Sequence, residues 1–206
     1  MPRFEQLALR GVALVTPDVH GDARGFFLER WKASAYLAYG IGPFVQHNHS
    51  RSQRGVLRGL HWQVPPHAQG KLVSVPRGRI FDVAVDLRWG SPTFGRWVGA
   101  VLDDVDHRQL WIPAGFAHGF MVRSEVADVA YASTAEYAPE AERGLAWDDP
   151  EVGVDWASEG DLPKSTGDPP DTAPEDVTPE LSERDRHRPR LADLGSHDLF
   201  EWEDPT

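Results

Sequence analysis

The sequence predicts an all-β protein. Between residues 44 and 137, short apolar or alternating segments follow one another at even spacing, separated by Gly, Pro, Asn and Asp. Many short strands with turn residues between them are typical of a β-sandwich or a small barrel. Helical periodicity is scarce, and the best candidate for a helix is SAYLAYG at residues 34–40. Because 206 residues suffice for one domain with a substantial core, we expect a single all-β domain with a few short helices.

Eight segments have the length and pattern of strands. Some alternate polar and apolar side chains, as half-buried strands do, and others are continuous apolar runs of strand length. In chain order they are FVQHNHS (44–50), GVLRGLHWQ (55–63), KLVSV (71–75), RIFDVAVDLR (79–88), RWVGAVL (96–102), RQLWIP (108–113), HGFMVR (118–123) and VADVAYAS (126–133).

The composition changes after residue 156. Residues 159–180 contain five Pro, seven acidic residues and one Lys, and such a segment cannot bury much apolar surface. Leu, Phe and Trp return after residue 181. We therefore expect a folded domain at 1–156, an acidic, proline-rich loop or linker at 157–180, and a C-terminal segment at 181–206 that docks on the same domain.

The charge distribution restricts the possible partners. The net charge is −11, but residues 157–206 account for −9 of it, so the body of the protein is nearly neutral. A local Arg cluster in the body could still bind a phosphate group. No basic stripe is present, so nucleic acid is not an expected partner.

Two absences in the sequence exclude further classes of protein. No run of eighteen apolar residues occurs and Met1 is not followed by a charged-then-apolar leader, so we expect a cytoplasmic protein without a membrane span. The chain has no Cys, which excludes disulfides, Cys-containing metal sites and thiol catalysis.

Several predicted strands carry polar residues that a sandwich core would not select. In the strand at 44–50, the two-residue period places Gln46 and Asn48 on one face and the two His residues between and after them on the other. In the next strand, Arg58 and His61 have opposite parity, so both can face one cavity only if the strand changes register. Gly59 is suitably placed for such a bulge.

Other strands add titratable side chains that could meet in the same cavity. Lys71, His118 and Tyr131 are candidates for the cavity, whereas we expect Asp82 and Asp86 to be structural partners of Arg side chains. His47 and His49 form an H-x-H pair, but no downstream Glu and His complete the spacing of a metal-binding cupin. We therefore expect a wet, cationic pocket with a base and no metal.

Long segments of the chain resemble the dTDP-4-dehydrorhamnose 3,5-epimerase family. The resemblance covers residues 4–156 and resumes at 181. It implies a cupin-type double-stranded β-helix, or jelly roll, that works as a homodimer on a dTDP-sugar without a cofactor. The segments that carry it are GDARGFF (21–27), QHNHSRSQRGVLRGLHWQ (46–63), QGKLV (69–73), IFDVAVDLRWGSPTFGRW (80–97), RQLWIPAGFAHGF (108–120), VAYASTAEYAPEAERG (129–144), WDDPEVGVDW (147–156) and LSERD (181–185).

The reaction implied by this resemblance inverts C3 and C5 of dTDP-4-dehydro-6-deoxy-D-glucose, both adjacent to a ketone. Such an inversion needs a base, a group that stabilises the enolate oxygen, and an acid on the opposite face. His61 suits the base because imidazole titrates near neutrality, and Lys71 suits the enolate because it is a compact cation. The resemblance implies that Tyr131 is the proton donor and that Asp185 orients the base.

The resemblance also implies a set of substrate contacts. Arg24, Phe26 and Glu29 correspond to an arm that a neighbouring subunit contributes, so the active sites would be shared. An Arg at a diphosphate makes charge-assisted, often bidentate hydrogen bonds. The remaining implied contacts are Gln46, Asn48 and Arg58 to the diphosphate and nucleotide, Tyr137 and Glu142 beside the thymidine, and His118 in the sugar pocket.

Three alternatives remain open from the sequence. The protein could epimerise C3 alone, because double and single inversion differ by small changes in pose and acid placement. It could be a metal-dependent cupin such as an oxygenase or a sugar-phosphate isomerase, which a chelator would inactivate. It could also be a sugar-binding cupin without catalysis. The presence of His61, Lys71 and Tyr131 together would then be a coincidence, because binding alone does not need a base, a cation and a proton donor.

Overall fold

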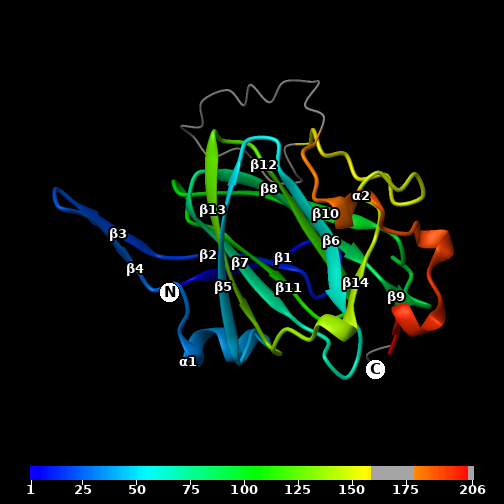
Figure 1. Cartoon of the computed structure of the whole chain (residues 1–206). Helices are drawn as coiled ribbons and strands as arrows, with labels where there is room; N and C mark the ends of the chain where they lie inside the picture. The colour runs from blue at the N-terminus through cyan, green and yellow to red at the C-terminus, as the bar shows by residue number, and fades with distance from the viewer. Residues whose placement is uncertain (159–178, 204–206) are drawn as a thin grey trace.

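Two antiparallel sheets packed face to face form the body of the computed structural model, which describes residues 1–158 and 179–203 (Figure 1). The six-stranded sheet has the order β1 (Arg3–Gln6), β2 (Ala13–Thr16), β11 (Gln109–Ile112), β7 (Lys71–Arg77), β13 (Val126–Ser133) and β5 (Gln46–Gln53). The five-stranded sheet has the order β10 (Trp97–Asp103), β8 (Arg79–Asp86), β12 (Phe116–Val122), β6 (Leu57–Gln63) and β14 (Glu142–Gly144). The predicted all-β class is confirmed.

The eight strands expected from the sequence correspond to β5 to β8 and β10 to β13. The expected helix is present as α1 (Ala33–Tyr36), continued by the 3-10 helix η1 (Leu37–Tyr39). The remaining short helices are η2 (Pro139–Ala141), α2 (Glu183–Arg186), η3 (Leu191–Asp193) and η4 (Ser196–Asp198). None of the helices in the described residues is long and apolar enough to cross a membrane.

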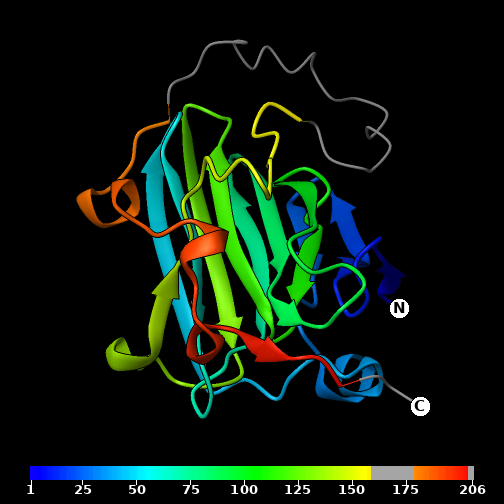
Figure 2. The same cartoon turned by 90° about the vertical axis from the view of Figure 1, so that its right-hand side faces the viewer.

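The five-stranded sheet is buried on both faces. Its inner face packs against the six-stranded sheet, where Ile80 and Phe120 meet Val73 and Val129. Its outer face packs against the segment around Trp156 and against the C-terminal segment, which Figure 2 shows in orange and red across the strands. Burial on both faces explains why apolar side chains occupy both faces of β8, in which every residue after Arg79 is buried.

The C-terminal segment is held to the body by backbone and side-chain contacts. Leu57 N donates to Glu180 O at 3.0 Å, and Trp62 Nε1 donates to Asp198 O at 2.8 Å. Farther along, β15 (Phe200–Glu201) pairs in parallel with β9 (Arg88–Trp89). Residues 159–178, where most of the expected linker falls, lie outside the described residues.

An N-terminal hairpin extends away from the body. It consists of β3 (Val19–Asp22) and β4 (Gly25–Leu28), paired only with each other among the described strands. Figure 1 shows the hairpin in blue, projecting beyond the sheets, and the centroid of the Phe26 ring lies 4.5 Å from that of the His107 ring on the body. Phe26 and Phe27 are 61% and 66% exposed, which is unusual for adjacent large apolar residues.

The predicted register change in β6 is present at Gly59. Across the ladder to β12, His61 pairs with His118 but Arg58 pairs with Phe120, so the pairing shifts between them. Gly59 has φ +130°, and a Cβ at this position would lie 2.4 Å from the Cα of Gly119. The bulge thus requires glycine, and it turns both Arg58 and His61 toward the same cavity.

This geometry makes Gly59→Ala strongly destabilising. The substitution combines an unfavourable φ with a backbone contact that cannot relax, so we expect the free energy of unfolding to fall by about 2 to 4 kcal/mol. Urea denaturation followed by tryptophan fluorescence measures it. Gly21→Ala is the control, because its nearest contact would be at 3.8 Å and its φ is not left-handed. Equal stability of both variants would contradict the assigned bulge.

Candidate active site

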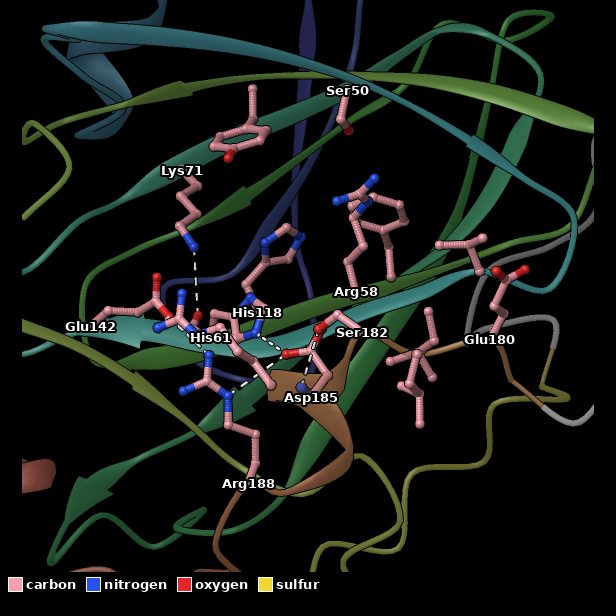
Figure 3. A pocket seen from close by; sticks show the side chains of 16 residues that line it. Ser50, Arg58, His61, Lys71, His118, Glu142, Glu180, Ser182, Asp185 and Arg188 are labelled. Carbon is pink, nitrogen blue, oxygen red and sulfur yellow. Dashed lines mark hydrogen bonds and ion pairs between the residues drawn. The ribbon is translucent and has the colours of Figure 1, made fainter. Parts of the chain in front are cut away.

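A cavity of about 490 Å³ lies between the two sheets and is closed on one side by the C-terminal segment (Figure 3). β6 and β12 supply one wall, and β5, β7 and β13 supply the facing wall. Seven residues predicted from the sequence line it: Arg58, His61, Lys71, His118, Tyr131, Glu142 and Asp185.

The closest polar contact in the cavity joins His61 to Asp185. His61 Nε2 lies 2.5 Å from Asp185 Oδ1, although the residues are 124 positions apart in the sequence. Asp185 lies in α2, whose N-terminus is capped by Ser182: the Ser182 side chain accepts a hydrogen bond from Asp185 N. The cap fixes this short helical turn, and the turn directs the carboxylate toward the imidazole.

The surroundings of Asp185 determine the tautomer of His61. Burial opposes ionisation of Asp185, but the hydrogen bond and charge of His61, the Ser182 side chain and Arg188 together lower the pKa of the carboxyl. An ionised carboxylate accepts hydrogen bonds and cannot donate one. His61 Nε2 therefore carries the proton in this contact, and Nδ1 holds the lone pair that can accept a proton.

Lys71 is a buried cation beside the base. Its Nζ donates to the backbone oxygen of His61 at 3.5 Å. Burial lowers the pKa of Lys71 to about 8, and the negative charges of Asp82 and Glu142 partly oppose that effect. Lys71 is thus mostly protonated at neutral pH and is placed where a charge on a bound oxygen would be stabilised.

His118 forms a second His–Asp pair in the floor of the cavity. Its Nε2 lies 2.7 Å from Asp82 Oδ1, so the expectation that Asp82 pairs with Arg was wrong. Strand alternation gives the face of a side chain but not its neighbour on the next strand, which explains the error. The same expectation for Asp86 is confirmed, because Arg88 donates to both of its carboxylate oxygens.

Burial also controls the protonation of His118 and Tyr131. Burial lowers the pKa of His118, which Asp82 opposes and the positive charges of Lys71 and His61 reinforce. Burial raises the pKa of Tyr131, with Arg58 opposing it, so its phenol keeps its proton. Tyr131 lies on β13 and His61 on β6, hence on opposite sheets. A proton acceptor and a proton donor therefore face the cavity from opposite walls.

A smaller cavity of about 290 Å³ continues from the main one along β5. The two share His61, Lys71, Tyr131 and Glu142 in their linings. Gln46, Asn48 and Tyr137, all predicted from the sequence, line the smaller one. Gln46 Nε2 donates to Asn48 Oδ1, Tyr137 N donates to Gln46 Oε1, and Tyr137 Oη donates to Glu142 Oε2. These bonds give the smaller cavity a polar wall.

Two arginines that the sequence analysis did not select also line the main cavity. Arg184 and Arg188 each place an Nη2 against Glu142 Oε1, at 2.7 and 2.8 Å. No helical spacing marks Arg188, because α2 ends at Arg186 and residue 188 lies beyond its C-cap. The other lining residues not selected are Ser50, Val56, Leu57, Phe120, Glu180, Leu181 and Ser182.

Three predicted residues are not part of either cavity. Arg24, Phe26 and Glu29 belong to the hairpin or follow it, and the Arg24 side chain is 90% exposed and paired with Asp22. His47 and His49 are exposed on the outer face of β5, as their parity predicted. Across the described ranges, no three His, Asp or Glu side chains are grouped so that they could hold a metal ion.

Comparisons with known proteins agree with this architecture and site. The sequence model of the dTDP-4-dehydrorhamnose 3,5-epimerase family matches residues 6–193. The chain belongs to this family. It is 50% identical over 190 residues to the dTDP-4-dehydrorhamnose 3,5-epimerase of Pseudomonas aeruginosa. The aligned region covers 91% of this chain and 95% of that protein. Its fold is the cupin-type β-sandwich of the family.

Two solved structures similar to this chain come from epimerases of different types. A dTDP-6-deoxy-D-glucose-3,5-epimerase from Legionella pneumophila, in complex with dTDP-4-keto-L-rhamnose, matches with a TM-score of 0.87 and 41% identity over 99% of this chain and 100% of that one. A 3′-monoepimerase from Streptomyces bikiniensis, in complex with dTDP-quinovose, matches with a TM-score of 0.79 and 33% identity over 91% of this chain and 87% of that one.

The electrostatics of the cavity give a direct test at Lys71. We expect the Lys71 ammonium to titrate near pH 8 in the folded protein, followed through its ¹³Cε NMR shift. Asp82→Asn removes a negative charge that opposes the effect of burial, so it lowers the midpoint further. Asp18→Asn, a surface change, leaves the midpoint in place. A Lys71 midpoint at the ordinary value of about 10.4, or no response to Asp82→Asn, contradicts this description.

Proposed function

We propose that this chain catalyses the cofactor-free epimerisation of dTDP-4-dehydro-6-deoxy-D-glucose at C3 and C5, giving dTDP-4-dehydro-L-rhamnose. The observation that carries the proposal is one cavity lined by a His–Asp pair on one side, a tyrosine on the facing sheet and a buried lysine between them. The family membership of the chain and its 50% identity to a 3,5-epimerase support the same reaction.

The chemistry follows from where each proton can move. His61 accepts the proton α to the C4 ketone, and Asp185 stabilises the imidazolium that forms. The Lys71 ammonium stabilises the enolate oxygen, which bears the developing charge. Tyr131 then donates its proton to the opposite face of the carbon, and the configuration inverts. Transfer of the proton from His61 to solvent, and of one from solvent to Tyr131, restores both groups.

The polar residues away from this centre suit the nucleotide. Arg58 lies in the main cavity with its Nε donating to Ser52 Oγ at 3.0 Å, which leaves its terminal nitrogens for a diphosphate. Gln46, Asn48 and Tyr137 in the smaller cavity offer amide groups and an aromatic ring for the thymidine end. The two connected cavities thus match a ligand with a sugar at one end and a base at the other.

Epimerisation at C3 alone is the second candidate. The solved 3′-monoepimerase demonstrates that related chains perform it. Its identity to this chain is 33%, against 50% for the 3,5-epimerase of Pseudomonas aeruginosa, and this difference favours inversion at both carbons.

Proton NMR of the substrate incubated in heavy water tests the function. We expect deuterium at both C3 and C5, because each inversion exchanges the α hydrogen with solvent. Deuterium at C3 alone identifies a single epimerase. His61→Ala should slow both exchanges by about 10² to 10⁴-fold, the usual contribution of a general base. Exchange at neither carbon with the unmodified protein, under conditions where it is folded, rejects the proposal.

Asp185→Asn isolates the contribution of the carboxylate. The amide keeps the shape of the side chain but loses the charge that stabilises the imidazolium, so kcat should fall by at least about 10²-fold with a smaller change in KM. Glu183→Gln in the same helix is the matched control, because its side chain is 87% exposed and lies outside both cavities. If Glu183→Gln loses kcat while Asp185→Asn does not, another acid acts on the base.

We also propose that the protein works as a homodimer whose hairpins complete each other's sites. The hairpin exposes Phe26 and Phe27 to solvent in the single chain, and its Arg24 lies outside both cavities of that chain. An exposed apolar hairpin next to charged residues suits insertion into a second copy. Arg24, Phe26 and Glu29 would then contact the nucleotide bound by the partner.

Mixing two inactive variants tests this arrangement. In a mixed dimer of Arg24→Ala and His61→Ala, one of the two sites contains both an intact hairpin residue and an intact base. We therefore expect activity to return toward a quarter of the wild-type value when subunits exchange freely, since about half of the dimers are mixed and each has one intact site. Demonstrated subunit exchange without any recovery argues that each site is built within one chain.

A further inference from the structure

Arg188 lies directly behind the proposed base, in a space that the fold provides for it. Its side chain is 14% exposed, its Nη2 donates to Glu142 Oε1 at 2.8 Å, and its Nε lies 3.6 Å from Asp185 Oδ1 (Figure 3). That Nε makes no hydrogen bond within the described residues. The guanidinium is therefore an almost buried cation shared between two carboxylates.

The neighbouring strand leaves room for this guanidinium because residue 144 is glycine. A Cβ on Gly144 would lie 2.4 Å from Arg188 Nε and 2.7 Å from its Cζ. Gly144 is paired in the β14–β6 ladder with His61 itself. The same short piece of sheet thus carries the base on one strand and the slot for Arg188 on the next.

The two acids beside His61 show what a buried cation does there. Burial opposes ionisation of Asp185 and Glu142, and Arg188 is among the groups that lower the pKa of both carboxyls. Arg184 also contacts Glu142, but its side chain is 66% exposed and solvent screens its charge. The other charged or titratable groups facing the site are Arg58 of β6, Lys71 of β7, Asp82 of β8, His118 of β12, Tyr131 of β13 and Glu180 of the C-terminal segment.

We propose that Arg188 is a positioning residue for the reaction, which acts through Asp185 and Glu142 to hold the Asp185 carboxylate against His61 Nε2. It offsets the charge of both acids, so that both carboxylates can lie beside one guanidinium and the dyad orients the base. This inference rests on the proposed function for its catalytic meaning, but the contact between His61 and Asp185 is measurable on the protein without substrate.

Arg188→Gln tests the proposal through the contact between His61 and Asp185. In the free protein, the NMR signal of the His61 Nε2 proton, which lies far downfield when the hydrogen bond to Asp185 is short, should move upfield, and kcat should fall by about 10-fold with a smaller change in KM. Arg188→Lys keeps the charge and should recover most of the wild-type signal and kcat. Arg186→Gln is the matched control, because it removes the same charge from a side chain that is 51% exposed and lies outside both cavities.

Gly144→Ala provides a second route that retains every charge. The added methyl group must displace the end of the Arg188 side chain, so the His61 Nε2 proton signal should move in the same direction as in Arg188→Gln. In the Arg188→Gln background, Gly144→Ala should add nothing to the shift, since there is no guanidinium left to displace.

The outcomes separate this inference from the proposed function. If Arg188→Gln lowers kcat but leaves the His61 Nε2 proton signal unchanged, Arg188 does not act through the contact between His61 and Asp185 and the proposal is overturned. If the signal moves as expected but the unmodified protein exchanges no substrate hydrogen, the structural inference stands and the proposed reaction fails. Should Arg188→Gln not fold, the signals of Gly144→Ala and Arg188→Lys decide the question.

Discussion

The contact between His61 and Asp185 is the constraint on which the site depends. The imidazole is fixed in the five-stranded sheet, but the carboxylate arrives on a four-residue helix in a segment that is remote in sequence. Four residues of helix are too short to be stable alone. The helix therefore depends on its cap and on the packing of the C-terminal segment against the outer face of the sheet, so the active geometry and the docking of this segment are a single event.

Burial and charge oppose each other throughout the cavity, and their balance sets the state of each group. Burial alone would neutralise Lys71 and Asp185, whereas nearby opposite charges preserve them as ions. His118 and Tyr131 show the other outcome, because burial prevails and keeps both uncharged near neutral pH. A cation, an anion and a neutral phenol that can donate a proton can thus lie around one substrate carbon and its ketone, which is what stepwise proton transfer needs.

Much of the fold was predictable because it depends on local patterns. Eight strands, the helix at α1, the outward direction of His47 and the register change at Gly59 follow from periodicity and from the conformational freedom of glycine. Strands β1 to β4 were not predicted, because they lie before residue 44, where the regular pattern of strand segments begins. The very short strands β9, β14 and β15 depend on pairing partners rather than on their own sequences.

The site was predictable in its residue types but less so in its partners. The polar residues of the predicted strands selected Arg58, His61, Lys71, His118 and Tyr131. The resemblance added Glu142 and, across the long acidic segment, Asp185. The pairing of Asp82 with His118 was missed because it crosses from β8 to β12, and cross-strand neighbours are not encoded in alternation. Arg188 was missed because its importance comes from an absent side chain at Gly144, 44 positions earlier. Such relations exist only in the folded chain.

The tautomer of His61 tests the account most directly, because every step assigned to the base depends on it. Nitrogen-15 NMR of the imidazole in the free protein, at a pH where the ring is neutral, distinguishes the two ring nitrogens by their chemical shifts. We expect the proton on Nε2, donated to Asp185, and an unprotonated Nδ1 available to substrate. A proton on Nδ1, with Nε2 bare and no hydrogen bond to Asp185, would contradict the arrangement of base and carboxylate described above.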